Sequence, residues 1–141
     1  IQETDGQLTR LWVGDRIAFV PQQPERIETP LLREAKAQLE AYFERRLQKF
    51  SLPLFLQGTA FQLKVWKLLQ NIPYGEITTY GEIAALSGNP KACRAVGRTN
   101  GQNPLPIFIP CHRVVGSGKK LVGYTGGLDI KIKLLEIEGV L

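Results

Sequence analysis

Apolar residues recur every three or four positions between residues 29 and 51, which is the spacing of one buried helix face. Thr29 and Pro30 open this segment with a hydroxyl N-cap and a proline at the first helical position. Ser51 and Pro53 follow the last apolar position and are expected to end the helix. The predicted buried face comprises Leu32, Ala35, Leu39, Phe43, Leu47 and Phe50.

Two strand-like runs precede this helix in IQETDGQLTRLWV, with Asp5 and Gly6 between them. Both residues tolerate positive φ, so the pattern predicts a hairpin with a tight turn. Ile1 would then lie within a hairpin, and the chain contains no methionine, so we expect the N-terminal lobe to be truncated. Residues 14–28 are predicted to form a loop.

A helical pattern resumes after LPLFLQG, residues 52–58, which is predicted to link an N-terminal lobe (1–51) to a C-terminal domain (59–141). Thr59 and Gln62 form a capping-box pair at the start of this pattern, AFQLKVWKLLQNI. Pro73, which follows this segment, is expected to end the helix. We therefore expect the C-terminal domain to begin with a helix.

Two further short helices are predicted next. Thr79 and Glu82 form a second capping box, and the helix that they start ends near Gly88, which is free to take the left-handed C′ conformation. Asn89 and Pro90 then supply a new N-cap and first helical position, for a helix that runs to about residue 100.

Two short helices joined by a glycine-bearing turn are typical of a helix-turn-helix, here at about residues 79–100. The second helix would align three basic residues at spacings of three, four and seven along one face: Lys91, Arg94 and Arg98. Small apolar residues occupy much of its remaining surface, namely Ala92, Cys93, Ala95 and Val96. Such a slim helix can approach another surface closely, although a solvated basic face is the simpler interpretation of the charges alone.

We therefore predict an α+β fold with a small N-terminal sheet-plus-helix lobe and a mainly helical C-terminal domain that contains the helix-turn-helix and a short hairpin. At 141 residues the chain can bury one good core. An apolar fraction of 43% and a charged fraction of 22% are ordinary for a soluble globular protein. No apolar stretch approaches a membrane span, and no signal-peptide pattern is present. The net charge of +5 favours polyanionic partners only modestly.

One of the two cysteines, Cys111, stands beside the only histidine, His112, at the end of the proline-bracketed run NPLPIFIPCHRVVG. A thiolate is a nucleophile, and a neighbouring imidazole can activate it. Adjacent residues of an extended chain point to opposite faces, so the pair needs a bend after Pro110 or a bridging water. A buried structural cysteine beside a satisfied histidine is the simpler interpretation of the dipeptide alone.

Other cysteine chemistries fit the sequence less well. Cys93, Cys111 and His112 are only three candidate zinc ligands, and the zinc deaminase signature is absent, so we expect no metal site. A cysteine protease would need a distant histidine, and an α/β-hydrolase would need G-x-S-x-G. Two cysteines without other signs of a disulfide scaffold predict a reducing, intracellular compartment.

A carboxylate is unfavourably placed at the end of the last predicted helix, LDIKIKLLEIEG. Glu138 precedes Gly139, where a negative charge meets the negative end of the helix dipole at a cost of roughly 0.3–1 kcal/mol. Chance placement is one interpretation. The other is a specific partner, for which His112 is the natural candidate, since a carboxylate can orient an imidazole. The intervening GYTGGL, with Tyr124 and Thr125, suits either a pocket wall or an ordinary turn.

PCHRV with upstream NP, preceded by RAVG and followed by GYTGG and LLEIEG, resembles the O6-alkylguanine-DNA alkyltransferase family from about Thr59 to Gly139. The resemblance implies repair of O6-alkylguanine, and less readily O4-alkylthymine, by transfer of the alkyl group to the protein's own cysteine. It implies a monomer that needs no cofactor, flips the base out of duplex DNA and is spent after one event. It also implies the cytoplasm of a prokaryote or the nucleus of a eukaryote.

The resemblance assigns roles to the candidate residues. Cys111 matches the alkyl acceptor, His112 the histidine that takes the thiol proton through a water, and Glu138 the carboxylate behind it. Asn103 matches the asparagine that orders the segment and its water network. The guanine pocket matches Tyr80, Val114, Tyr124 and Thr125, together with the Cys111 backbone.

The same resemblance places the second helix of the helix-turn-helix in the minor groove. Arg94 matches the finger that fills the gap left by the flipped base, and Tyr80 matches the tyrosine that crowds the target phosphate. The other expected DNA contacts are Lys91, Ala92, Ala95, Gly97 and Arg98. Gly101 stands where some relatives carry arginine, and the zinc ligands of some relatives' N-terminal lobes have no counterpart.

A DNA-binding module without efficient transfer is the alternative function. Relatives of that kind replace the acceptor cysteine, so the presence of Cys111 argues against it. A thiol pKa lowered by about three units would represent roughly 4 kcal/mol, so we expect loss of the relay to change the alkylation rate by orders of magnitude. We also expect Glu138→Gln to slow alkylation and to leave folding largely intact.

Overall fold

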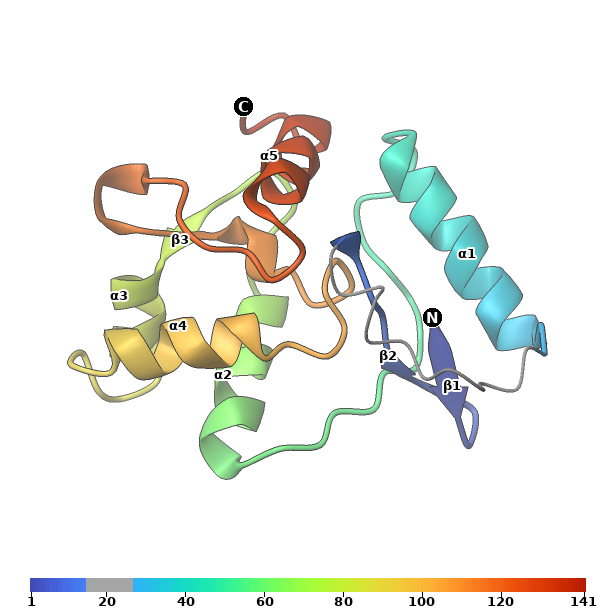
Figure 1. The fold of residues 1–141 in the computed structure, drawn as a ribbon, viewed down its shortest axis with the longest axis horizontal. Coiled ribbons are helices and arrows are strands. Elements are labelled where there is room, and N and C mark those ends of the chain that lie inside the picture. Colours follow the sequence, from blue (N-terminus) through green and yellow to red (C-terminus); the bar gives the residue numbers. More distant parts are fainter. Residues whose placement is uncertain (15–26) are drawn as a thin grey trace.

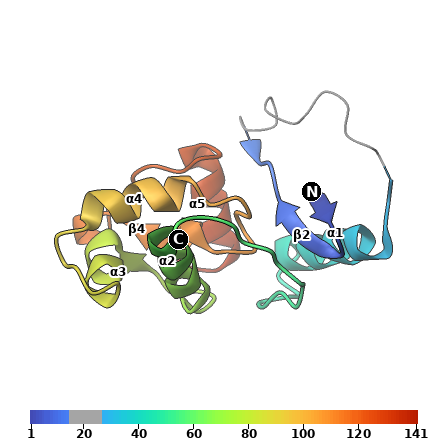
Figure 2. The ribbon, with the colours of Figure 1, turned by 90° about the horizontal axis from the view of Figure 1, so that it is seen from below.

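A computed structural model describes residues 1–14 and 27–141, and it confirms the predicted α+β class. The elements are β1 (Gln2–Thr4), β2 (Gln7–Arg10), α1 (Pro30–Phe43), α2 (Ala60–Gln70), β3 (Thr78–Thr79), α3 (Tyr80–Leu86), α4 (Cys93–Gly101), β4 (Val114–Val115) and α5 (Leu128–Ile137), with 3₁₀ turns at Cys111–Arg113 and Ser117–Lys119. Strands β1 and β2 lie with α1 on one side, and α2 to α5 lie on the other (Figures 1 and 2). Within the described residues, no helix is long and apolar enough to cross a membrane. Most of the loop predicted over residues 14–28 falls outside the described residues.

The N-terminal hairpin is confirmed. Strands β1 and β2 pair antiparallel, with Thr4 opposite Gln7. Asp5 and Gly6 have φ values of 51° and 75°, the positive range that a tight turn of this kind requires. Leu8 on β2 is fully buried, so the hairpin presents one side chain to the core at its centre.

The helix α1 begins as predicted and ends earlier. The Thr29 hydroxyl accepts a hydrogen bond from the Leu32 amide at 3.1 Å, which is the expected N-cap. The prediction that the helix continues to residue 50 is wrong, because Arg45 takes a φ of 61°, which an α-helix cannot contain. Phe43, predicted to be buried, is 46% exposed, and Tyr42 occupies the core in its place.

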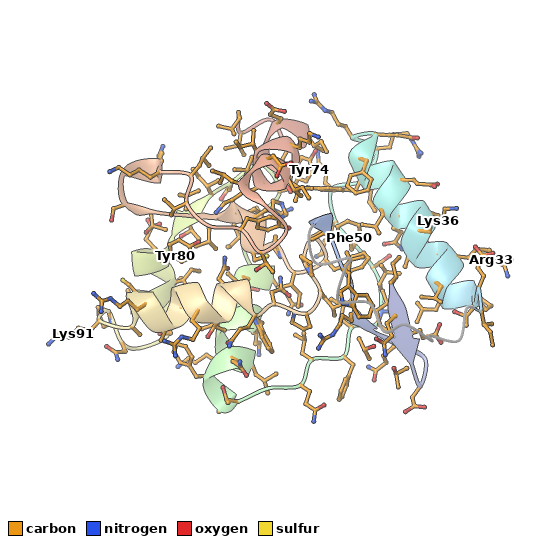
Figure 3. The ribbon with its side chains drawn as sticks, viewed as in Figure 1. Arg33, Lys36, Phe50, Tyr74, Tyr80 and Lys91 are labelled. Carbon is orange, nitrogen blue, oxygen red and sulfur yellow. The ribbon has the colours of Figure 1, made fainter. Side chains whose placement is uncertain are left out.

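The segment 52–58 pairs with the hairpin. The Leu8 amide donates to the Pro53 carbonyl at 2.8 Å, and the Phe55 amide donates to the Leu8 carbonyl at 2.9 Å. The hydrophobic core is continuous across this segment and includes residues from both sides of it. Phe50 packs between Tyr42 and Phe108, with ring centroids 5.4 and 5.0 Å away, and it lies between α1 and the C-terminal elements in Figure 3. The exact limits of the two lobes stay a prediction.

The capping boxes at α2 and α3 are both formed as predicted. Thr59 pairs reciprocally with Gln62, and Thr79 pairs reciprocally with Glu82. Gly88 follows α3 with a φ of 96°, in the left-handed conformation expected there.

The predicted start of α4 is wrong by three residues. The Asn89 side chain accepts from the Lys91 amide at 3.0 Å, closing a local turn, and the helix begins at Cys93 without a side-chain cap. Asparagine competes for the backbone in this way because its short side chain reaches an amide two residues on. Lys91 therefore lies in the turn before α4. Helices α3 and α4 still pack together as a helix-turn-helix unit (Figure 2).

The short hairpin predicted for the C-terminal domain is not formed. The two strands of this domain, β3 and β4, pair in parallel instead, with Thr78 opposite Val114 and Thr79 opposite Val115. Parallel neighbours need a long crossover, and here α3 and α4 lie between the two strands in the chain. The pairing joins the start of the helix-turn-helix to the segment that carries Cys111 and His112.

Candidate active site

The segment that leads to Cys111 is buried and held by side-chain amides. Residues 105–115 are all buried. The Asn103 side chain donates to the Ile109 carbonyl at 2.8 Å and accepts from the Leu105 amide at 2.9 Å. The Asn100 side chain donates to the Cys111 carbonyl at 3.2 Å. These bonds fix the backbone on both sides of the cysteine.

The chain bends after Pro110, which is one of the two conditions under which Cys111 and His112 could act together. Cys111, His112 and Arg113 form one 3₁₀ turn, and all three side chains are buried. Within the described residues the thiol and the imidazole make no direct hydrogen bond. The His112 Nδ1 atom is buried and has no partner in the described part of the chain. It is therefore the ring atom that remains available to a water or a ligand.

Glu138 lies against His112, the partner proposed from its position at the helix end. It caps the C-terminus of α5, and its Oε1 atom lies 2.7 Å from His112 Nε2, with both side chains fully buried. Because a carboxylate only accepts, the Nε2 atom carries the proton and donates it to Glu138. This tautomer leaves Nδ1 as an acceptor.

Three further residues that donate to Glu138 were missed in the sequence. The Arg113 guanidinium binds both carboxylate oxygens, with Nε–Oε2 at 2.9 Å and Nη2–Oε1 at 2.8 Å, and the Tyr42 hydroxyl donates to Oε1 at 2.7 Å. The Gly75 amide donates to Oε2 at 3.3 Å. A signal for Tyr42 existed, because it follows Leu39 at helical spacing; Arg113 stood directly after the histidine.

The pKa values describe a resting site that is neutral at sulfur and imidazole. Burial raises the pKa of the Cys111 thiol to about 11, against smaller opposing effects of Asn103 and Lys131. Burial also lowers the pKa of His112, although Glu138 opposes it. Burial would raise the pKa of Glu138, but hydrogen bonds from His112 and Arg113 lower it to about 2. The resting thiol therefore has a raised pKa, because desolvation of the anion dominates.

The glycine-rich loop packs beside the cysteine. The Tyr124 hydroxyl is buried without a hydrogen-bond partner in the described residues, and burial and the nearby Cys111 thiolate form raise its pKa. The Thr125 hydroxyl donates to the Gly101 carbonyl at 2.7 Å, so the loop is tied to the end of α4. Of the two interpretations of the segment GYTGGL, a pocket wall fits this packing better than an ordinary turn.

A buried lysine holds the other side of this loop. Lys131 on α5 is fully buried and donates to the carbonyls of Val114, Val122 and Gly123 at 2.5, 3.1 and 3.2 Å. Burial lowers its pKa to about 8. Sequence reasoning missed this residue, because a lysine in a helical pattern is normally solvated. It fixes the Val114 backbone that the pocket assignment uses.

The helix α4 presents its basic residues to solvent on the opposite side from its packed face. Arg94 and Arg98 are exposed, and none of the salt bridges among the described residues includes them or Lys91. Lys91 points away from the molecule in Figure 3. A Cβ added to Gly97 would lie 3.9 Å from the Tyr80 ring, so α4 approaches this tyrosine closely. Ala92 is half-buried and Ala95 is exposed.

No cluster of three or more metal-ligating side chains exists in residues 1–14 and 27–141. Comparisons with known proteins show the family of the chain. The sequence model of the family described as "6-O-methylguanine DNA methyltransferase, DNA binding domain" matches residues 60–140, more than half of the chain. The chain belongs to this family.

Similar proteins extend the match to both lobes. The constitutive methylated-DNA–protein-cysteine methyltransferase of Bacillus subtilis is 49% identical over 99% of this chain and 88% of its own length. The crystal structure of Mycobacterium tuberculosis OGT in complex with DNA has a TM-score of 0.81 and 45% identity, over 96% of this chain and 83% of that one. A structure of Mycobacterium tuberculosis O6-methylguanine methyltransferase has a TM-score of 0.72 and 53% identity, over 76% of this chain and 65% of that one.

The residues that match the 6-O-methylguanine DNA methyltransferase family model include both the buried Cys111 site and the exposed helix α4. The structure brings Cys111, His112, Glu138 and Asn103 together and puts Tyr124 beside Cys111. Thr125 lies next in the same loop and bonds to Gly101 at the end of α4. Arg94 and Arg98 lie on the exposed face of α4.

Proposed function

We propose that this protein repairs DNA by moving the alkyl group of O6-alkylguanine, and less readily of O4-alkylthymine, to the Sγ atom of Cys111. The observation that carries the proposal is the Glu138–His112 pair behind a buried thiol, with Nδ1 left without a partner in the described residues. The relatives named as methylated-DNA–protein-cysteine methyltransferases support the same reaction.

The reaction begins with the thiol in its neutral form. The thiol proton passes through a water to His112 Nδ1, and Glu138 stabilises the resulting imidazolium. The Sγ atom then attacks the alkyl carbon as the carbon–O6 bond breaks, and the electron pair moves into the guanine base. The base takes up one proton and the His112 imidazolium releases one through the water, so the proton lost by the thiol balances the proton gained by the base. The product is a thioether. Nothing in this step regenerates the thiol, so each molecule reacts once.

Duplex DNA is the proposed partner. Helix α4 enters the minor groove, where its small residues permit close approach, and Arg94 takes the place of the flipped base. Tyr80, which lies between α4 and the cysteine segment, crowds the target phosphate. Extrusion of a base costs a few kcal/mol, and contacts in the pocket and from the finger offset this cost. The DNA complex of a relative with a TM-score of 0.81 supports DNA as the partner.

Stoichiometric transfer to one cysteine is the first prediction. After reaction with excess DNA containing O6-methylguanine, mass spectrometry should show one added methyl group per protein, on the Cys111 peptide. Cys93 is exposed and should stay unmodified, because no base or carboxylate network faces it among the described contacts. Repeated turnover, or a methyl group on Cys93, would contradict the assignment. Retention of labelled DNA without transfer would instead identify the alternative, a DNA-binding module.

A nearly flat pH profile is the second prediction. Between about pH 6.5 and 7.5 the alkylation rate with a free O6-alkylguanine base should change by less than about twofold. The pKa of Cys111 is raised to about 11 and that of His112 is lowered, so both groups stay neutral in this window. An unassisted thiol with its usual pKa near 8.5 would instead gain about tenfold in thiolate. A tenfold rise in rate would show that Cys111 reacts without the relay.

A further inference from the structure

Tyr42 brings the helix α1 into the buried network around Glu138. Its side chain is fully buried, its hydroxyl donates to Glu138 Oε1 at 2.7 Å, and the same hydroxyl lies 3.4 Å from His112 Nε2. Tyr42 and Glu138 are 96 positions apart in the sequence. The remaining hydrogen bonds to the Glu138 carboxylate come from the 3₁₀ turn at residues 111–113 and from the Gly75 amide. The N-terminal side of the molecule thus contributes a polar group within hydrogen-bond distance of this carboxylate.

The direction of each hydrogen bond follows from the chemistry of the groups. Glu138 is ionised and only accepts, so Tyr42 and the Nε2–H of His112 both donate to the same oxygen, Oε1. Each additional donor stabilises the carboxylate anion and weakens its pull on the proton of Nε2. Tyr42 therefore acts on the imidazole through the carboxylate.

We propose that Tyr42 is a positioning residue that acts through Glu138: its hydroxyl moderates the pull of the carboxylate on the His112 ring, so that the ring rests neutral and Nδ1 is free to receive the proton of the Cys111 thiol. The inference rests on the proposed function only in naming that thiol as the proton source. It makes helix α1 part of the active site, although the matched family domain begins at residue 60.

Several charged or titratable groups face His112, and the test has to separate Tyr42 from them. They are Glu138 and Lys131 from α5, Cys111 and Arg113 from its own turn, and Tyr42 from α1, with Tyr74 packed behind Tyr42 and Arg113. A tyrosine-to-phenylalanine change removes one donor without changing the net charge. The carboxylate then becomes more basic, so it stabilises the imidazolium more strongly and the pKa of His112 rises.

His112 is the only histidine of the chain, so its ring can be observed alone by ¹⁵N nuclear magnetic resonance. In the titration of the unreacted protein, Tyr42→Phe should raise the pKa of His112 by about half a unit to one unit. The acid limb of the alkylation rate profile should move to higher pH by the same amount. An unchanged titration would overturn the proposal and leave Tyr42 with a packing role.

Tyr74→Phe is the matched control. Tyr74 lies 6.1 Å from Tyr42 between rings, close to α5 in Figure 3, but its hydroxyl donates to the Ile137 carbonyl at 3.0 Å and not to Glu138. Its loss removes a hydroxyl from the same aromatic cluster and should leave the pKa of His112 within about 0.2 units. An equal shift in both variants would indicate a general loss of packing and would also overturn the proposal.

A second substitution keeps the test decisive if Tyr42→Phe folds poorly. Replacing Tyr42 with 3-fluorotyrosine retains the ring and the hydroxyl but makes the hydroxyl a stronger donor, so the pKa of His112 should fall. A rise or no change would contradict the proposal. The titration uses unreacted protein without DNA, so it remains informative even if alkyl transfer to Cys111 is not found; a lack of transfer in the wild type would contradict the proposed function alone.

Discussion

Glu138→Gln is expected to slow alkyl transfer by about two to four orders of magnitude, with a free base as well as with duplex DNA. Glutamine removes the charge that stabilises the His112 imidazolium, so the proton of the Cys111 thiol has a poorer acceptor. The side-chain amide can also donate to the ring, which allows the tautomer with its proton on Nδ1. The rate constant for the free base is the measurement, because it excludes any effect on DNA binding.

The same substitution should destabilise the fold, which revises the expectation drawn from the sequence. Glu138 is the buried partner of Arg113, and removal of one partner of a buried ion pair costs about 3–5 kcal/mol. Urea unfolding should show a loss of this order. Glu136→Gln is the matched control, since it removes the same charge from the exposed side of α5. It should change neither the rate nor the stability appreciably; an equal effect of both variants would assign the loss to net charge.

The pH dependence of stability gives an independent check on Glu138. Its pKa in the folded state is about 2, below the ordinary value of 4.5. The stabilisation is therefore fully present above about pH 4.5 and is lost as the pH falls through about 2. Glu138→Gln should lack this part of the acid dependence. A variant with the wild-type acid profile would show that the carboxylate is not held by His112 and Arg113.

Arg94→Ala is expected to slow repair in duplex DNA roughly a hundredfold and to leave the reaction with a free O6-alkylguanine base nearly unchanged. In the proposed role, Arg94 would compensate part of the few kcal/mol needed to extrude a base, and each 1.4 kcal/mol corresponds to about tenfold in rate. The free base needs no extrusion. Arg94 is exposed on α4, so its removal should not disturb the core.

Lys91→Ala separates flipping from binding. Lys91 lies in the exposed turn before α4, where a phosphate contact is expected. Its loss should lower duplex affinity and reduce the salt slope by about one, with free-base reactivity unchanged. Both variants should be measured with both substrates. If Arg94→Ala slows the free base as much as the duplex, Arg94 supports the pocket or the fold, and the finger assignment fails.

The early end of α1 shows why some sequence predictions failed. The apolar pattern continued to Phe50, but the chain turned at Arg45 and still packed Phe50 against Phe108. The spacing of apolar residues indicates which side chains are buried, but it does not show whether they all belong to one helix. The parallel pairing of Thr78 with Val114 was not predicted, because strands of two residues leave almost no alternating pattern in the sequence.

The sequence by itself determined the features that depend on neighbours a few residues apart. The hairpin at Asp5-Gly6 and the capping boxes at Thr59 and Thr79 were predicted and are confirmed, because their hydrogen bonds join residues within eight positions of one another. The family was also evident from ordered motifs around PCHRV, and the matched family domain confirms it.

Only the tertiary structure decided how the candidate site is charged. The sequence suggested that Glu138 meets His112, 26 positions away. The helical spacing of Tyr42 and the place of Arg113 beside His112 did not show that both bind the same carboxylate. It also could not show that burial raises the pKa of Cys111 above its usual value. Desolvation and hydrogen bonding act over a few ångströms in space, so the protonation of this site depends on residues that only the fold brings together.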